Sequence, residues 1–183
     1  MGKYIMALMG TSNIGKSCVL KKLWDFLPGK VENIFNKRAI YNITGIKNTK
    51  LTKIGMCTIG DVSDGDDLDS IQGGLALMVK KNCDIIVCAC HTRKQFFNAI
   101  NNLSSTTINK RLEDSGINGI KDLKSIEEII KKEYKIIGCG HFCDWNITPQ
   151  PISQTKKTYA KVGGVDLTEL SAQNILNLMN SLE

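Results

Sequence analysis

The stretch that decides the fold is residues 4–27, YIMALMGTSNIGKSCVLKKLWDFL. It opens with six uncharged residues, 4–9, as expected of a strand buried inside a sheet. A loop bounded by glycines, 10–17, comes next. Apolar residues then recur at helical spacing up to Leu27, and Pro28-Gly29 ends the pattern. The stretch therefore predicts a strand, a loop and a helix in direct succession.

The loop reads GTSNIGKS, the spacing G-x-x-x-x-G-K-S. Gly10 and Gly15 let the backbone approach a ligand closely, so that successive N–H groups can converge on phosphate oxygens at the positive end of a helix. Lys16 is expected on the β/γ-phosphates, and the Ser17 hydroxyl in the coordination shell of Mg²⁺. The predicted nucleotide-binding residues are Gly10, Thr11, Ser12, Asn13, Ile14, Gly15, Lys16, Ser17 and Cys18.

This loop, with its preceding strand and following helix, resembles the Walker A motif of the P-loop NTPase superfamily. The resemblance implies a three-layer α/β fold with a mostly parallel sheet, binding of a nucleoside triphosphate with Mg²⁺, and a catalytic role for Lys16. The alternative is an ordinary strand–turn–helix unit whose glycines serve only the turn.

Two β-branched runs, 38–46 and 51–59, predict an antiparallel hairpin that turns at the polar residues 47–50. Residues 30–36, between the first helix and the hairpin, are expected to be a connector. Beyond these runs, the alternation of strand and helix patterns predicts a single domain over residues 1–183.

The second run ends in an acidic segment, GDVSDGDD at residues 60–67, some 45 to 50 residues after Lys16. P-loop enzymes place at such a strand end the carboxylate that holds the magnesium shell or orients water. We therefore expect Asp61 to take this metal-binding and catalytic role, with Asp64 the second candidate. Asp66, Asp67 and Asp69 are explained by capping of a helix over 67–81.

Residues 84–90 are nearly all apolar and predict a strand buried on both faces. Thr92 and Gln95 then have capping-box spacing for a following helix. Ligands of open α/β sheets bind outside the carboxyl ends of the strands, which places His91, Thr92 and Arg93 on the same rim as the loop 10–17. Arg93 is a catalytic candidate for contact with phosphate or substrate. Its alternative is a solvated arginine in a first helical turn.

Residues 104–119 are polar, with Ile108, Leu112 and Ile117 as apolar anchors. We expect a functional loop near the nucleotide rim. A helix over 121–133 capped by Ser125 and Glu128, a strand over 134–139, a surface loop over 148–159 and a closing helix capped by Asp166 complete the chain.

The seven cysteines are an odd number, and no disulfide framework is predicted. Cys88, Cys90 and His91 end one strand, and Cys139, His141 and Cys143 follow another that could lie near it, a set of soft ligands suited to zinc. These spacings match no common zinc module, and buried thiols explain them more simply.

Composition narrows the class of protein. At 183 residues, 42% hydrophobic and 23% charged, the chain is expected to be a soluble domain with a true core. It has no run of 18 apolar residues and no signal-peptide pattern, which predicts a cytoplasmic protein that does not enter a membrane. The net charge of +6 is spread too evenly to indicate a nucleic-acid surface.

The guanine-binding pattern Asn-Lys-x-Asp is absent, because Asn109-Lys110-Arg111 is followed by Leu112. ATP is therefore the expected nucleotide. The chain resembles small bacterial single-domain ATP-binding proteins of undefined role, and more distantly nucleotide and small-molecule kinases. This implies phosphoryl transfer or hydrolysis. The alternative is an NTP-dependent switch that acts through a protein partner.

Overall fold

The structure, a computed structural model, describes residues 2–10, 15–35, 38–44, 51–57, 71–108, 110–139, 161–162 and 165–182. Its elements in chain order are β1 (Lys3–Met9), α1 (Lys16–Phe26), β2 (Lys30–Phe35), β3 (Arg38–Thr44), β4 (Leu51–Cys57), α2 (Ile71–Lys80), β5 (Ile85–Cys90), α3 (Arg93–Asn101), η2 (Leu103–Ser105), α4 (Lys110–Asp114), α5 (Gly119–Glu133), β6 (Tyr134–Cys139), β7 (Lys161–Val162), β8 (Val165–Asp166) and α6 (Leu167–Asn180).

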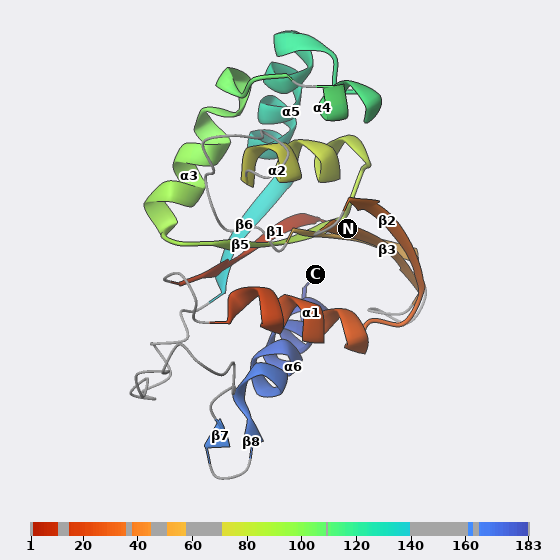
Figure 1. The fold of residues 1–183 in the computed structure, drawn as a ribbon, viewed down its shortest axis with the longest axis vertical. Coiled ribbons are helices and arrows are strands. Elements are labelled where there is room, and N and C mark those ends of the chain that lie inside the picture. The colour runs from red at the N-terminus through yellow and green to blue at the C-terminus, as the bar shows by residue number, and fades with distance from the viewer. Residues whose placement is uncertain are drawn as a thin grey trace.

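Within the described residues, the main sheet has six strands in the order β2-β3-β4-β5-β1-β6 (Figure 1). Strands β4, β5, β1 and β6 run parallel, whereas β3 pairs antiparallel with both β2 and β4. The predicted α/β class, with a mostly parallel sheet and an antiparallel hairpin, is confirmed. The hairpin turn expected at 47–50 lies outside the described residues.

Helices cover both faces of the sheet. Helices α1 and α6 pack on one face, and α2, α3 and α5 pack on the other (Figure 1). Along β1, Ile5 and Ala7 enter one core cluster, while Met6 and Leu8 enter the opposite one. A strand buried on both faces in this way is typical of the centre of a parallel sheet. The sheet therefore lies between two helical layers.

The expectation of a connector at 30–36 is wrong. Residues 30–35 form β2, which pairs with β3 through a register shift between Asn33 and Phe35. Strand β2 lies at the edge of the sheet as described and pairs there with β3. Such a strand is formed largely by pairing with its partner, and its own residues, KVENIF, carry no strict alternation that would predict it.

The predicted start of the helix over 121–133 is also wrong. Helix α5 begins at Gly119, so Ser125 and Glu128 lie inside it and cannot cap it. The Asp122 carboxylate instead accepts a hydrogen bond from the Asn118 N–H at 2.8 Å. Asp122 lies in the first turn of α5, where its negative charge is favourable beside the positive end of the helix.

The described residues of the segment 104–119, which are 104–108 and 110–119, include the end of η2 and all of α4. Leu112 and Ile117 are fully buried, and Ile108 packs against the same core cluster, as expected of the three anchors. A Cβ atom at Gly116 would lie 3.7 Å from Lys80, the last residue of α2 before β5 begins. This part of the segment lies at the amino edge of the sheet. The expected place beside the carboxyl edge is therefore wrong for it.

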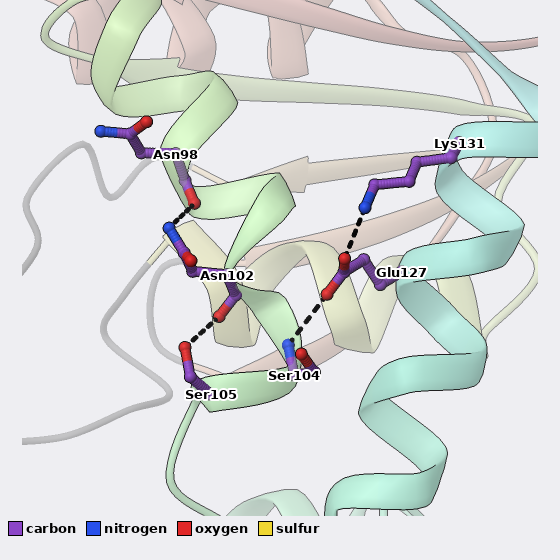
Figure 2. Close-up of polar contacts among 6 residues, drawn as sticks. All are labelled: Asn98, Asn102, Ser104, Ser105, Glu127 and Lys131. Atoms are coloured by element: carbon purple, nitrogen blue, oxygen red, sulfur yellow. Dashed lines mark hydrogen bonds and ion pairs between the residues drawn. The ribbon is translucent and has the colours of Figure 1, made fainter.

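A short polar network fastens η2 to α5 (Figure 2). The Glu127 carboxylate accepts hydrogen bonds from the Ser104 N–H at 3.2 Å and from Lys131 Nζ. Burial raises the pKa of Glu127, but these hydrogen bonds outweigh it and hold the pKa below the ordinary 4.5. The ionised carboxylate therefore stabilises the packing of residues 103–105 on α5.

None of the helices in the described part of the chain combines the length and the apolar content that a membrane crossing requires.

We predict that Glu127→Ala lowers the free energy of unfolding at pH 7 by about 1–2 kcal/mol, because the Ser104 N–H loses its acceptor. Glu128→Ala, an exposed neighbour on α5, should stay within about 0.5 kcal/mol of wild type. A carboxyl group with a lowered folded-state pKa stabilises above its unfolded pKa and loses this effect as the pH falls through the folded value. Urea titrations should thus show the Glu127 effect shrinking below pH 4.5. Equal losses in both variants would contradict the role of Glu127.

Candidate functional site

The loop 10–17 joins the carboxyl end of β1 to the start of α1. Gly15 caps α1 with φ 92°, a left-handed conformation that glycine adopts without steric cost. At the other end of the loop, the Gly10 N–H donates to the Cys90 carbonyl of β5 at 3.1 Å. Gly15 is therefore required for the left-handed turn before α1, and Gly10 is held in place by its hydrogen bond to β5. Residues 11–14, with the predicted ligands Thr11, Ser12, Asn13 and Ile14, lie outside the described residues.

Lys16 is buried at the first turn of α1, with 6% of its surface exposed. Its Nζ donates a hydrogen bond to the Gly10 carbonyl at 2.7 Å, so the side chain folds back across the start of the loop. Lysine ammonium groups normally stay in water. The first turn of α1 contains no acidic residue that would offset the positive end of the helix. An ammonium and a helix N-terminus therefore meet at one place, an arrangement suited to an anion.

Cys90 lies beside this lysine, at the end of β5. Burial raises the pKa of the Cys90 thiol to about 11, although the Lys16 ammonium opposes the rise. Its Sγ lies 3.9 Å from the Leu8 carbonyl of β1. At neutral pH the thiol stays protonated. Cys90 therefore places an uncharged side chain beside Lys16 and does not act as a nucleophile. The sequence indicated a buried thiol or a zinc ligand at Cys90, but not its place beside Lys16, because no local pattern indicates which strand lies beside β1.

The strand order separates β1 from β4, the strand that precedes the predicted acidic residues. Strand β4, which precedes them, runs parallel to β5 and so ends at the same sheet edge as β1. Strand β5 lies between β4 and β1, however, so β4 is two strand spacings from β1, about 10 Å. Asp61 and Asp64 themselves lie outside the described residues, and their catalytic and metal-binding roles stay predictions.

Thr92 and Arg93 follow β5, the strand that lies beside β1 in the sheet. Thr92 Oγ1 accepts the Gln95 N–H at 3.1 Å, which confirms the predicted cap of α3. Arg93 follows at the carboxyl edge, exposed, with its guanidinium 5.6 Å from the centre of the Phe97 ring. This stacking fits a surface arginine, and contact between Arg93 and phosphate stays a prediction.

Ser17 and Cys18 follow Lys16 in the first turn of α1. Ser17 is exposed, and Cys18 is half-buried and forms no disulfide. Ser17 therefore lies at the same helix end as the Lys16 ammonium, the place at which the Walker A pattern expects a metal-binding hydroxyl.

The strands that carry the two halves of the expected zinc set are not neighbours. Strands β5 and β6 flank β1 on opposite sides, about 10 Å apart. The thiols of Cys88 and Cys90 are buried, with Sγ at 3.7 and 3.9 Å from carbonyl oxygens of β1. His141 and Cys143 lie outside the described residues, and the described ranges hold no cluster of three or more His, Cys, Asp or Glu residues arranged for a metal. The two strands thus end at the same edge of the sheet but are separated by β1.

Comparisons of the chain with protein-family models, with curated proteins and with solved structures give no match. The geometry around β1, α1 and β5 is therefore the basis on which a function is inferred.

We predict that Cys90 resists alkylation by iodoacetamide in the native protein at pH 8, because its thiol is buried and its pKa is raised. The half-buried Cys18 should react first, and mass spectrometry of the digested protein measures both sites. In urea the two cysteines should react at similar rates. Native labelling of Cys90 as fast as that of Cys18 would contradict the described environment.

Proposed function

We propose that the protein binds MgATP at the loop 10–17 and catalyses transfer or hydrolysis of the γ-phosphoryl group. The observation that carries this proposal is the buried Lys16 ammonium, 2.7 Å from the Gly10 carbonyl at the start of α1. The pattern G-x-x-x-x-G-K-S and the strand–loop–helix context support it.

Binding of the nucleotide would replace one hydrogen-bond acceptor of Lys16 with a more strongly binding one. The hydrogen bond to the neutral Gly10 carbonyl would give way to charge-assisted hydrogen bonds with β- and γ-phosphate oxygens. Backbone N–H groups at the N-terminus of α1 would add to this attraction. Because Lys16 already lies in the loop region, little side-chain entropy is lost when the phosphates arrive.

Ser17 is the described residue suited to hold Mg²⁺, since its hydroxyl follows Lys16 at the exposed end of α1. When bound with the nucleotide, the ion neutralises charge on the phosphates. Asp61, with Asp64 second, would complete the magnesium shell or orient the attacking water. Arg93 would supply positive charge to the transferred group from the carboxyl edge.

ATP is preferred to GTP because the guanine-binding pattern is absent from the sequence. The alternative function, a switch read by a protein partner, requires that nucleotide binding proceed with little turnover. Release of ADP from MgATP by the wild-type protein, alone and with candidate acceptors, distinguishes the two functions.

We predict that Lys16→Ala weakens MgATP binding about ten- to a hundredfold, as expected for the loss of a charge-assisted contact of about 1.5–3 kcal/mol. Lys21→Ala is the matched control, because Lys21 is exposed on the same helix and should leave the affinity unchanged. Isothermal titration calorimetry measures the affinities, and circular dichroism checks that both variants fold. Equal MgATP affinity of Lys16→Ala and Lys21→Ala would overturn the proposal.

A further inference from the structure

An open groove of about 350 Å³ lies between α3 and the start of α2. Its polar lining consists of a hydroxyl, an ammonium and four carboxamides, from Thr92, Lys94, Gln72, Gln95, Asn98 and Asn102. A volume of this size suits a small ligand. The described lining contains neither a carboxylate nor an aromatic side chain.

The groove begins near the proposed phosphate site. Thr92 comes two residues after Cys90, whose carbonyl accepts the Gly10 N–H. From there the groove follows α3 through Gln95, Asn98 and Asn102, which are three and four residues apart and so share one face of the helix. One end of the groove is therefore at the carboxyl edge of the sheet, beside the strand that adjoins β1.

Some of the lining polar atoms are already used inside the protein. Gln95 Oε1 accepts the His91 N–H at 3.3 Å, and Asn102 Nδ2 donates to the Asn98 carbonyl at 3.0 Å. The Asn98 carboxamide has no hydrogen-bond partner among the described residues and points away from α5 (Figure 2). Donors and acceptors are thus both left for a ligand, from Asn98, the Gln95 amide nitrogen and the Asn102 amide oxygen.

We propose that this groove binds the phosphoryl acceptor, a non-aromatic polyhydroxylated small molecule that carries an anionic group, such as a sugar or polyol phosphate. Carboxamides match hydroxyl groups, which also both donate and accept. Lys94, the ionised group of the described lining, selects for negative charge. The absence of an aromatic side chain from the described lining disfavours a nucleobase, which binds by stacking.

This inference rests on the proposed function, because the acceptor role requires ATP at the loop 10–17. In the transfer, an acceptor hydroxyl oxygen forms a bond to the γ-phosphorus. The bond from the γ-phosphorus to the bridging oxygen breaks, its electron pair stays on ADP, and the hydroxyl proton passes to water. Asn98 and Lys94 act here as binding residues that hold the acceptor in place.

The test is an NMR titration of the ¹⁵N-labelled protein with ribose 5-phosphate and glycerol 3-phosphate. Ribose, inorganic phosphate and AMP are the comparison probes. We expect the two polyol phosphates to shift the side-chain NH₂ signals of Gln95 and Asn98 and to bind more tightly than the comparison probes. Asn98→Ala should weaken their binding tenfold or more. Asn101→Ala, an exposed asparagine of α3 outside the groove lining, should bind them as wild type does.

MgATP affinity of the same proteins separates this inference from the proposed function. If MgATP binds normally but the polyol phosphates shift neither Gln95 nor Asn98, the inference alone is overturned. The same holds if MgATP binds normally and the polyol phosphates bind Asn98→Ala and Asn101→Ala with equal affinity. Tighter binding of AMP or of inorganic phosphate in the groove overturns it as well. Polyol phosphate binding without MgATP binding overturns the proposed function and the acceptor role together.

Discussion

The hydrogen bond from the buried Lys16 ammonium to the Gly10 carbonyl is the interaction on which the proposed site depends. A buried charge is costly unless it is hydrogen-bonded, so its position must be set by rigid elements around it. Strand β1 is one of these rigid elements, because it is buried on both faces of the sheet. Helix α1 is the other rigid element, and Gly15 forms the turn that brings Lys16 over the start of the loop.

The order of the strands decides which groups surround that lysine. Since β5 lies between β4 and β1, the carbonyl and thiol of Cys90 adjoin the loop, and β4 is about 10 Å from β1. The same order places the start of α3 close to the loop. The proposed nucleotide site at β1 and the polar groove along α3 therefore share the carboxyl edge of the sheet, the edge at which α/β proteins bind ligands.

Much of the fold could be predicted because its central elements carry strong periodic patterns. The uncharged run of β1, the helical spacing of α1 and the wholly apolar β5 each indicate their structure without knowledge of their neighbours. Strand β2 and the start of α5 were missed, since pairing with β3 and the Asp122 hydrogen bond define them. Of the site, the pattern predicted Lys16 with its glycines. It could not predict that Cys90 adjoins Lys16, because strand order is a property of the whole sheet, nor that the amides of α3 line a groove, because they resemble an ordinary solvated face.

The most direct test of the central claim is a crystal structure of the protein with Mg²⁺ and a non-hydrolysable ATP analogue. We expect Lys16 Nζ to leave the Gly10 carbonyl and to lie within hydrogen-bonding distance of β- or γ-phosphate oxygens, at the N-terminus of α1. An analogue bound elsewhere, with the 2.7 Å hydrogen bond between Lys16 and Gly10 intact, would contradict it.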